Sequence, residues 1–488
     1  MKQETIFNDN QTTTKKRSGP PNKMNDLSYK EWMKFQKSFF RHTSFQHLTE
    51  EFIYFFTKSK WDSGLFSRSL IIGVEGFDNQ LIPSPRITET KDAFSFDDVL
   101  DVLNDALEGS KQYDFLMIDF RQLIKNKKAS DEFVLRYSEN IFKAIRQLLR
   151  PKMYCCILAG FGKDKNQDFP YPWALALSSR NHVKLRDEKI GLIEYSGELY
   201  YTLIFQAEDD ERRPFFMISE KIINGTVDKD IPTWIFPKSP ARKPNEILHP
   251  AKFPETLVRE FIELFTEPGD KVFDPMVGTG STVLAAVQSG RKGYGIDISL
   301  DFINIAKSRM CSTWQISLFE ETSETDYILL QGDATKVEEI EEFKNLRFQY
   351  VITSPPYWSM LSNKGSENQK TRRQKKLPLV YSDDKRDLGN VQSYDEFLYA
   401  LDGVYKQVAK KLVEGGYLTI VVKNIKRDNV VYPLAWDLVS VLCKPEANYE
   451  YIGTTMWCQD DIGLKPFAVG IHWVSNTLHH YCLHFRKK

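Results

Sequence analysis

Residues 271–286 read KVFDPMVGTGSTVLAA, and this stretch decides the fold that the sequence predicts. Apolar residues up to Asp274 are typical of a short strand, and the small residues after Gly280 are typical of a helix. Between them, Gly278 and Gly280 let the backbone turn tightly, while the helix N-terminus presents free N–H groups to a ligand. The loop is neither a Gly-x-Gly-x-x-Gly dinucleotide turn nor a Walker A loop. An acidic residue at the strand tip suits a ligand that carries an ammonium group.

Two more strands downstream end at an aspartate. GRKGYGIDIS (290–299) places Asp297 at a second strand tip, and ILLQGDATK (328–336) places Asp333 at a third. A carboxylate at the second tip is the usual partner of ribose hydroxyls, and Asp333 can meet an adenine edge. Each aspartate alone could cap a helix instead. Three in succession predict an α/β fold, a Rossmann-like doubly wound sheet that holds a nucleoside at the carboxyl ends of its strands.

A fourth strand ends abruptly in TSPPYW (353–358). Proline has no N–H and a fixed φ, so the pair presents its carbonyl groups on a rigid loop. Alone, the motif is also compatible with a plain strand-to-loop turn, because Pro-Pro pairs mark loops. Its place behind a nucleoside-binding sheet favours a site for a second ligand.

Together, HPAKFPE (249–255), FDPMVGTGSTVLAA, GYGIDIS, GDAT and TSPPYW resemble the motifs of amino-group DNA methyltransferases that use S-adenosylmethionine. The resemblance covers roughly residues 246–488 in motif order. The Ser-Pro-Pro-Tyr form resembles the cytosine-N4 branch most, since adenine-N6 enzymes more often carry Asp-Pro-Pro-Tyr or Asn-Pro-Pro-Tyr. Adenine-N6 methylation, an RNA substrate and a non-catalytic DNA-binding protein remain alternatives.

The resemblance implies roles for the matching residues. Phe253 and the loop from Asp274 to Gly280 would hold the methionine part of the cofactor, Asp297 the ribose and Asp333 the adenine. The cofactor-binding residues implied in this way are Phe253, Asp274, Pro275, Gly278, Thr279, Gly280, Asp297 and Asp333. The implied catalytic residues, which would hold the target base, are Ser354, Pro355, Pro356 and Tyr357.

The chemistry accounts for these residue types. An exocyclic amine is a poor nucleophile because its lone pair is conjugated into the ring, and acceptors on its N–H bonds favour the charge that develops in the transition state. The Ser354 hydroxyl and the Pro355 carbonyl are candidate acceptors, and Tyr357 can stack on the base. Duplex DNA hides this nitrogen, so the base must flip out. A cytosine-C5 mechanism needs a cysteine in a Pro-Cys context, and no cysteine follows a proline.

The N-terminal half repeats part of this pattern. Residues 131–160 align without a gap to residues 395–424, and LYYTLIFQ (199–206) echoes HHYCLHFR (479–486). The strand tip of the first copy carries Asp119 in place of Ser-Pro-Pro-Tyr. We therefore predict an internal duplication in which the first copy is a degenerate catalytic half, with a possible role as a DNA clamp.

Five segments follow from these patterns. A polar tail, expected to be disordered, precedes the degenerate copy, and a charged, proline-rich connector follows that copy. The segments are the tail 1–24, the N-terminal α/β region 25–207, the connector 208–245, the cofactor half 246–345 and the catalytic half 346–488. Within the first α/β region, Trp32, Phe35 and Phe39 stand at helical spacing and are expected to pack.

A basic insertion, residues 359–390, follows the catalytic tip directly. Basic loops beside an active site supply phosphate contacts, although a solvated surface loop has the same composition. The candidate DNA-binding residues are Lys364, Lys370, Arg372, Arg373, Lys375 and Lys376. No helix-turn-helix or zinc finger is apparent. Double-stranded DNA is the expected partner, with a cognate restriction endonuclease or defence-system subunits as possible further ones.

Bulk composition sets limits on the remaining classes. The 488 residues carry 66 basic and 66 acidic side chains, so a nucleic-acid partner must be sought in local patches. Six scattered cysteines predict neither a disulfide framework nor a zinc site and fit a reducing cytoplasm. No apolar run long enough for a membrane span occurs. We expect a soluble cytoplasmic protein without a bound metal.

Overall fold

The computed structural model of the chain describes residues 24–121, 123, 131–160, 162–164, 167–169, 171–209, 229–237, 253–314, 326–356, 358, 386–427, 430–444, 446–459 and 475–488. The chain divides into two compact units, which are described separately. The first unit comprises Met1–Pro214, Asn424–Pro433 and Gln459–His479. The second comprises Phe215–Lys423, Leu434–Cys458 and His480–Lys488.

The first unit contains a seven-stranded sheet in the order β1-β8-β9-β5-β4-β2-β3. All neighbouring strands are parallel except β9, which runs antiparallel to β5 and β8. Its strands are β1 (Phe39–His42), β2 (Arg68–Ile72), β3 (Ile87–Lys91), β4 (Tyr113–Asp119), β5 (Leu149–Ala159), β8 (Lys184–Ile193) and β9 (Glu198–Gln206). Two hairpins accompany it, β6 (Gly162–Asp164) with β7 (Gln167–Phe169), and β16 (Ile425–Arg427) with β17 (Val430–Tyr432).

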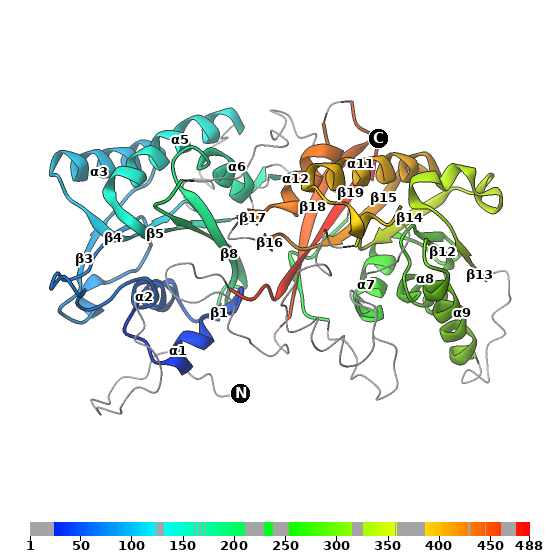
Figure 1. Ribbon diagram of the computed structural model, residues 1–488, viewed down its shortest axis with the longest axis horizontal. Helices are drawn as coiled ribbons and strands as arrows, with labels where there is room; N and C mark the ends of the chain where they lie inside the picture. The colour runs from blue at the N-terminus through cyan, green and yellow to red at the C-terminus, as the bar shows by residue number, and fades with distance from the viewer. Residues whose placement is uncertain are drawn as a thin grey trace. The chain divides into compact units, whose positions relative to one another are not determined.

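Helices cover both faces of the first sheet, as a doubly wound fold requires (Figure 1). Helices α3, α5 and α6 lie on one face and α2 on the other. The bounds are α1 (Tyr29–Lys34), α2 (Phe45–Phe56), α3 (Phe96–Glu108), α5 (Asp131–Leu148) and α6 (Tyr171–Ser178). The core beneath α2 is rich in phenylalanine, and Phe35 stacks on Phe55 with ring centroids 3.8 Å apart.

The predicted helical spacing of Trp32, Phe35 and Phe39 is wrong beyond the first turns. Helix α1 ends at Lys34, and Phe39 begins β1, which pairs with β8 at the edge of the sheet. Pairing with an existing strand satisfies the backbone of this short segment better than further helix would. The expectation that these aromatics pack is confirmed, because Trp32, Phe35 and Phe39 are all buried.

The second unit contains an eight-stranded sheet in the order β10-β18-β19-β15-β14-β11-β12-β13. Strands β15, β14, β11, β12 and β13 run parallel, and β19 is antiparallel to β15. Its strands are β10 (Trp234–Ile235), β11 (Lys271–Asp274), β12 (Lys292–Asp297), β13 (Tyr327–Gln331), β14 (Phe348–Thr353), β15 (Leu412–Val422), β18 (Tyr449–Cys458) and β19 (His479–Lys487). Strand β10 falls within the stretch that the sequence marked as a connector.

Helices α7, α8 and α9 lie on one face of this sheet, and α11 and α12 on the other (Figure 1). Their bounds are α7 (Glu255–Phe265), α8 (Ser281–Gln288), α9 (Leu300–Trp314), α11 (Tyr394–Lys411) and α12 (Leu434–Leu442), with short 3-10 turns η3 (Ala334–Glu339), η4 (Glu341–Phe343) and η5 (Leu388–Asn390). The predicted α/β fold is therefore confirmed: it is a Rossmann-like doubly wound sheet.

The two sheets have the same strand order. The order β1-β8-β9-β5-β4-β2-β3 matches β10-β18-β19-β15-β14-β11-β12 position by position, and only β13 has no counterpart. Both also contain the same register shift: Tyr113 pairs with Leu149 and Phe115 with Tyr154, while Phe348 pairs with Leu412 and Tyr350 with Tyr417. The repeat is thus wider than the sequence indicated, because β2 and β3 correspond to strands of the cofactor half.

The ungapped alignment of 131–160 with 395–424 is displaced by one residue. The equivalent positions are Leu149 with Leu412 and Tyr154 with Tyr417, whereas the alignment paired Leu148 with Leu412. Because the cores of β5 and β15 are buried on both faces, apolar residues run on without alternation and do not mark the register. The echo of 199–206 in 479–486 is confirmed, since Gln206 and Arg486 pair with the equivalent residues Tyr154 and Tyr417.

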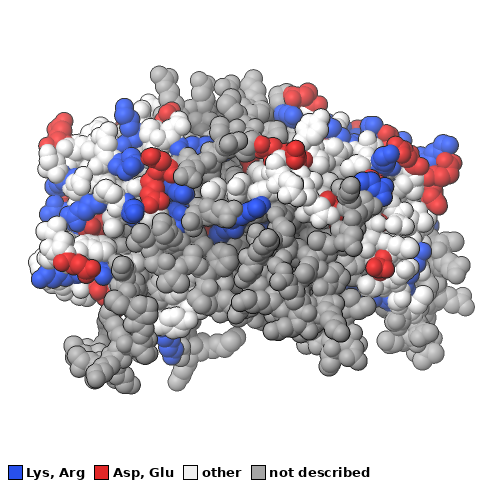
Figure 2. Space-filling model, in the orientation of Figure 1, with Lys and Arg blue, Asp and Glu red and all other residues white. Residues whose placement is uncertain are grey.

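Charge on the molecular surface is mixed. On the face drawn in Figure 2, basic and acidic side chains of the described residues are interspersed and form no broad patch of one sign. This agrees with a formal net charge of zero. The basic insertion that the sequence singled out lies outside the described residues for most of its length.

Candidate active site

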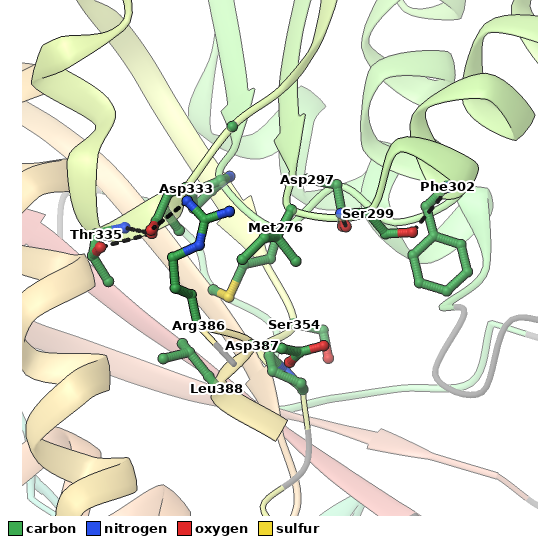
Figure 3. Close-up of a pocket in the computed structure, with 15 residues that line it drawn as sticks. Met276, Asp297, Ser299, Phe302, Asp333, Thr335, Ser354, Arg386, Asp387 and Leu388 are labelled. Carbon is green, nitrogen blue, oxygen red and sulfur yellow. Dashed lines mark hydrogen bonds and ion pairs between the residues drawn. The ribbon is translucent and has the colours of Figure 1, made fainter. Parts of the chain in front are cut away.

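A pocket with about 650 Å³ of empty space, part of it open to solvent, lies in the second unit at the carboxyl ends of β11, β12, β13 and β14 (Figure 3). Strand ends of a parallel sheet converge there, which is where doubly wound folds bind ligands. The lining residues are Pro275, Met276, Asp297, Ile298, Ser299, Phe302, Gly332, Asp333, Ala334, Thr335, Ser354, Pro356, Arg386, Asp387 and Leu388.

Asp297 ends β12 and enters the pocket. One carboxylate oxygen accepts a hydrogen bond from the Ser299 N–H at 2.9 Å, and the other accepts one from the Gly278 N–H at 2.8 Å. Burial raises the pKa of Asp297 to about 6, and the neighbouring Asp387 adds to the rise. The carboxylate is thus oriented by the glycine loop while each oxygen keeps a second acceptor site for a hydroxyl.

The glycine loop adopts the conformation that the sequence predicted. Gly278 and Gly280 have φ angles of 52° and 84°, in the region where side chains are strained. A Cβ added to Gly280 would come within 2.8 Å of the Ala306 Cβ on α9. The loop therefore turns tightly into the N-terminus of α8, and glycine is required at Gly280 by close helix packing as well as by the turn.

Asp274 is buried beneath the loop and does not line the pocket. Its carboxylate accepts hydrogen bonds from the Met276 N–H at 3.0 Å and from the Thr282 hydroxyl at 2.6 Å. Burial raises its pKa to about 6. These contacts tie the end of β11 to the first turn of α8, so the side chain shapes the loop from below.

Asp333 and Arg386 face each other across the pocket (Figure 3). One Asp333 oxygen accepts from the Thr335 N–H at 2.9 Å and the Thr335 hydroxyl at 2.6 Å. The other lies 3.8 Å from Nη1 of Arg386, a long contact that a ligand group could replace. The third strand end is therefore acidic, as predicted, but it has a basic partner that arrives from a segment far along the chain.

Ser354 stands at the tip of β14 and lines the same pocket. Its Oγ donates a hydrogen bond to the Val421 carbonyl on β15 at 2.9 Å. Because the following residue is Pro355, no backbone N–H can reach that carbonyl. The hydroxyl proton is thereby committed to the protein, and the serine oxygen offers its lone pairs to another donor.

A buried chain of hydroxyl and imidazole groups holds β14 to β15. Tyr350 donates to Thr419 at 2.7 Å, and the two nitrogens of His484 lie 2.9 Å from the hydroxyls of Thr419 and Thr455. Thr455 donates to the Pro232 carbonyl at 2.6 Å, so it accepts from Nε2–H of His484, and Nδ1 accepts from Thr419. Burial lowers the pKa of His484 to about 3, so the ring is neutral.

The structure brings together only part of the predicted site. Pro275, Asp297, Asp333, Ser354 and Pro356 line one pocket. The other predicted residues that the structure describes do not line the pocket: Phe253, Asp274, Gly278, Thr279, Gly280 and Pro355. Residues outside the described part of the chain are Tyr357, Lys364, Lys370, Arg372, Arg373, Lys375 and Lys376.

Two predicted positions have a packing role. Phe253 is buried in the core cluster of α7, which explains why an aromatic residue stands before that helix. Trp358 is buried and packs edge-on against Tyr394 of α11, with ring centroids 5.4 Å apart. Neither ring lines the pocket.

Four residues of the pocket lie outside every motif that the sequence analysis quoted for the site: Phe302, Arg386, Asp387 and Leu388. Phe302 lies in the first turn of α9 just after Asp297, so an aromatic residue one turn past the second strand tip was a usable signal. The other three lie near the end of the basic insertion 359–390, which was predicted to contact phosphate groups and not to line the pocket. Nothing in the local sequence shows that the chain returns to the pocket there.

The equivalent place in the first unit is closed. Asp119 ends β4, and the Arg121 guanidinium binds it through two contacts of 2.5 and 3.0 Å, with both side chains buried. Arg121 also contacts Glu198 at 3.2 Å and stacks over the Phe45 ring. Between β2 and β3 only the 3-10 turn η1 (Asn79–Leu81) stands where the second unit has α8. The predicted loss of the reaction site in the first copy therefore has a structural basis.

The described residues show neither a metal-binding group nor a membrane-spanning helix. Within the described ranges, no group of three or more His, Cys, Asp or Glu side chains is arranged to hold a metal ion. None of the helices in that part of the chain is long and apolar enough to cross a membrane.

The fold and the pocket define the class, a Rossmann-like methyltransferase sheet whose cofactor is S-adenosylmethionine. The chain belongs to the N6/N4 methyltransferase family described as DNA methylase, whose sequence model matches residues 2–308. The matched span ends inside α9 and does not reach Ser354. It covers the N-terminal part of the first unit followed by β11, α8 and β12.

Individual relatives match short stretches. The chain is 33% identical over 108 residues to the tRNA (guanine(10)-N2)-dimethyltransferase of Pyrococcus abyssi, covering 22% of this chain and 29% of the relative. It is 42% identical over 62 residues to the orphan methyltransferase M.BamHII of Bacillus amyloliquefaciens, covering 13% of this chain and 23% of the relative. The chain thus spans less than a third of either relative's length.

Among solved structures, the 16S rRNA N2 G1207 methyltransferase RsmC of T. thermophilus covers 87% of this chain and 88% of its own. The TM-score between that structure and this chain is 0.26, and the two sequences are 13% identical.

Proposed function

We propose that the chain is a DNA methyltransferase that transfers a methyl group from S-adenosylmethionine to the exocyclic N4 of cytosine. The observation that carries the proposal is the Ser354 hydroxyl, which lines the cofactor pocket while its proton is donated to Val421. A hydroxyl held in this way can only accept from a further donor, and an amino group of a base is such a donor.

The pocket fits the cofactor by the chemistry of its side chains. The Asp297 carboxylate would accept hydrogen bonds from the ribose hydroxyls, and the Asp333 side with Thr335 would meet the adenine edge. Asp274 acts by fixing the loop rather than by touching the methionine part. S-adenosylmethionine supplies a methyl group on a sulfonium, which makes that carbon an electrophile.

The chain's own residues would then orient the base. Ser354 Oγ and the Pro355 carbonyl accept the two N–H bonds of the amine, which localises its lone pair on nitrogen as it attacks the methyl carbon. The sulfonium sulfur would take the electron pair of the broken carbon–sulfur bond, and the nitrogen held by Ser354 would release one proton to solvent. In-line approach at about 3–3.5 Å makes positioning the main contribution.

The serine favours cytosine-N4 over adenine-N6. The support is the residue type alone, because the adenine-N6 enzymes resembled above more often carry Asp or Asn at this place. The test is mass spectrometry of nucleosides from DNA incubated with the purified chain and cofactor. N4-methylcytosine supports the proposal, N6-methyladenine moves the activity to the other branch, and neither product rejects both.

RNA is a second candidate substrate, favoured by the similarity to a tRNA guanine-N2 methyltransferase. Guanine N2 is also an exocyclic amine, so the same acceptors would serve it. Parallel reactions with duplex DNA and with transfer RNA, followed by the same nucleoside analysis, separate the two. Methyl-guanosine in RNA with unmodified DNA would overturn the DNA assignment.

A non-catalytic DNA-binding protein is the alternative from another class. The intact strand-end aspartates and the free acceptor face of Ser354 favour an enzyme. Calorimetry with S-adenosylmethionine distinguishes the enzyme from the non-catalytic protein, because absence of binding would leave only the non-catalytic role. We further propose that double-stranded DNA is the partner and that the basic insertion contacts its phosphate groups. We also propose a role in restriction-modification or another defence system. Methylome sequencing of a host that expresses the chain identifies the methylated base and its sequence context, and it tests this role at the same time.

A further inference from the structure

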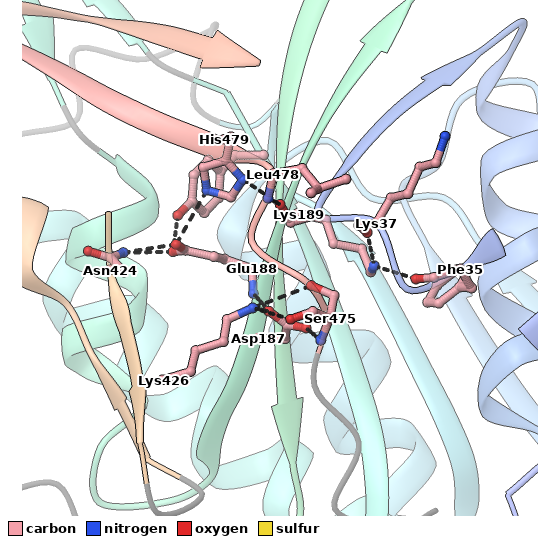
Figure 4. Close-up of polar contacts among 12 residues, drawn as sticks. Phe35, Lys37, Asp187, Glu188, Lys189, Asn424, Lys426, Ser475, Leu478 and His479 are labelled. Atoms are coloured by element: carbon pink, nitrogen blue, oxygen red, sulfur yellow. Dashed lines mark hydrogen bonds and ion pairs between the residues drawn. The ribbon is translucent and has the colours of Figure 1, made fainter. Parts of the chain in front are cut away.

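Four consecutive charged residues, Arg186 to Lys189, lie in β8 and are almost completely buried. Figure 4 shows the contacts of the last three, Asp187, Glu188 and Lys189. Burying charges is costly unless each one is paired and hydrogen-bonded. The equivalent strand of the second unit, β18, has the same length of 10 residues and reads YEYIGTTMWC, with no charge in its middle. The fold itself therefore does not require charges at this place.

Lys189 and Asp187 bind different segments of the chain. Lys189 donates to the carbonyls of Phe35 at 2.9 Å and Lys37 at 2.5 Å, which are in the N-terminal part of the first unit. Asp187 forms an ion pair with Lys426 and accepts from the Ser475 N–H at 2.5 Å. The two Lys189 contacts stay within the N-terminal half of the chain, whereas the two Asp187 contacts reach segments from the C-terminal half.

Glu188 holds the same two C-terminal segments. Nδ2 of Asn424 donates to both of its oxygens, at 3.0 and 2.9 Å, and Tyr201 donates to it as well. Nε2 of His479 lies 3.5 Å from Glu188, and Nδ1 of His479 lies 2.8 Å from the Ser38 hydroxyl. Asn424 and His479 are themselves buried. The C-terminal segments therefore supply two of the partners of this carboxylate, Asn424 and His479, in addition to Tyr201 of β9 (Figure 4).

The held segments are continuous with strands of the catalytic sheet. Asn424 follows β15 almost at once, since β15 ends at Val422, and His479 is the first residue of β19, which pairs with β15. Strand β15 carries the Val421 carbonyl that receives the Ser354 proton. Fixing Asn424 therefore fixes the end of the strand on which the serine depends.

We propose that Asp187 and Glu188 of the first unit are positioning residues for methyl transfer: they hold Asn424 and Lys426 so that the end of β15 keeps Val421 in place for Ser354. The copy that lost its own site would then serve the reaction of the other copy. The kinetic test of this inference, which measures kcat, rests on the proposed function. The structural test, which measures hydrogen exchange, does not.

The test uses an exchange of partners in the full-length chain. Asn424→Asp places a second carboxylate against Glu188, and adding Glu188→Gln restores one carboxylate facing one amide. Asn424→Asp is expected to lower kcat about tenfold, and the double variant to recover most of that loss, as coupled neighbours do. Cofactor affinity stays unchanged, since neither residue lines the pocket.

Hydrogen exchange provides the structural readout. Amides of residues 419–423 should exchange faster in Asn424→Asp and return toward the wild-type rate in the double variant. Glu51→Gln is the matched control: Glu51 is a buried carboxylate of the same unit, and its ion-pair partners among the described residues are His42 at 2.7 Å and His47 at 3.1 Å. It should lower stability without changing kcat or exchange at 419–423.

Each outcome of these experiments either supports or overturns the proposal. A folded Asn424→Asp variant with wild-type kcat and exchange, or a double variant with no recovery, overturns the proposal. If Asn424→Asp does not fold, the isosteric Glu188→Gln alone must speed exchange at 419–423, and an unchanged rate is equally negative. If the chain methylates nothing, the proposed function fails while the exchange data still decide the positioning role.

Discussion

Asp119 occupies in the first sheet the position that Ser354 occupies in the second. Phe115 and Tyr350 are equivalent in register, and each residue lies the same distance along its strand. In the first sheet the Leu158 carbonyl accepts from the Phe120 N–H at 2.8 Å. In the second, Pro355 removes that donor, and the Ser354 hydroxyl donates to the Val421 carbonyl instead. Because Pro355 has no N–H, the Ser354 hydroxyl donates its proton to the Val421 carbonyl, and the serine oxygen remains as an acceptor at the strand tip.

Replacement of Ser354 tests this arrangement. Ser354→Ala should lower kcat about 10²–10³-fold, which is the usual cost of removing one group that stabilises a transition state. The dissociation constant for S-adenosylmethionine should change little, because the hydroxyl is assigned to the base. Rates come from single-turnover methylation and affinity from calorimetry.

Pro355→Ala is the companion variant. It restores a backbone N–H that can compete for Val421, as Phe120 does for Leu158, so activity should fall without loss of the serine. Full activity in both variants would show that the base is held elsewhere.

The closed site of the first unit predicts cofactor stoichiometry. One molecule of S-adenosylmethionine should bind per chain, measured by calorimetry, because Arg121 fills the first strand tip and α8 has no counterpart there. Arg121→Ala should leave Asp119 buried and unpaired and cost about 3–5 kcal/mol in the unfolding of that unit. It should not create a second binding site; two sites in either protein would contradict the assignment.

Cofactor affinity should depend on pH through Asp297. Its pKa in the free protein is about 6, and ribose hydroxyls bind the ionised form, so binding lowers that pKa. Affinity is then constant above about pH 7 and falls toward tenfold per pH unit below about pH 6. Calorimetry between pH 5 and 8 measures the profile.

Asp297→Asn separates this effect from Asp274, whose pKa is also about 6. The variant should bind more weakly at pH 8 and lose most of the dependence. A profile as steep as that of the wild type would assign the titration to Asp274 instead.

The strand ends that form the pocket were predictable because each of these parts is local in the sequence. A strand, a glycine turn and a helix start are consecutive in KVFDPMVGTGSTVLAA, and Asp297 and Asp333 each end a strand. Parallel strands then bring these ends together without any further information. The same reasoning placed Asp274 in the site, although burial and two local hydrogen bonds occupy it beneath the loop.

Long-range pairings could not be predicted. Arg386 reaches Asp333, and Asn424 reaches Glu188, across separations that no periodicity encodes. The buried charges in β8 read in sequence as an exposed charge run, and only their partners explain them. The one-residue error between 131–160 and 395–424 arose for a related reason, since strands buried on both faces carry no alternation.

The neutral imidazole of His484 predicts a stability change with pH. Its pKa is about 3 in the folded protein, well below the ordinary value of 6.5, so the unfolded chain binds a proton that the folded one does not. The stability contribution is present above pH 6.5 and is lost as the pH falls toward 3, at about 1.4 kcal/mol per unit.

Thermal unfolding of the wild type and His484→Gln checks this. Glutamine can keep a contact to Thr419 or Thr455 but does not titrate. The variant should be less stable at pH 7, and the difference should shrink by pH 5. A constant difference across that range would show that His484 is not neutralised on folding.

The basic insertion should supply phosphate contacts. Neutralising Lys370, Arg372 and Arg373 together should weaken DNA binding and lower the slope of log affinity against log salt by up to about 2.7, at roughly 0.9 for each lost contact. Fluorescence anisotropy at several salt concentrations measures the slope. The control removes three cations that sit in ion pairs of the second unit away from the pocket, Lys344, Lys406 and Lys410, which should leave the slope nearly unchanged. An unchanged slope in the first triple variant would make the insertion a solvated surface loop, and DNA would then have to be held by other parts of the chain, with the N-terminal region 25–207 as the next candidate.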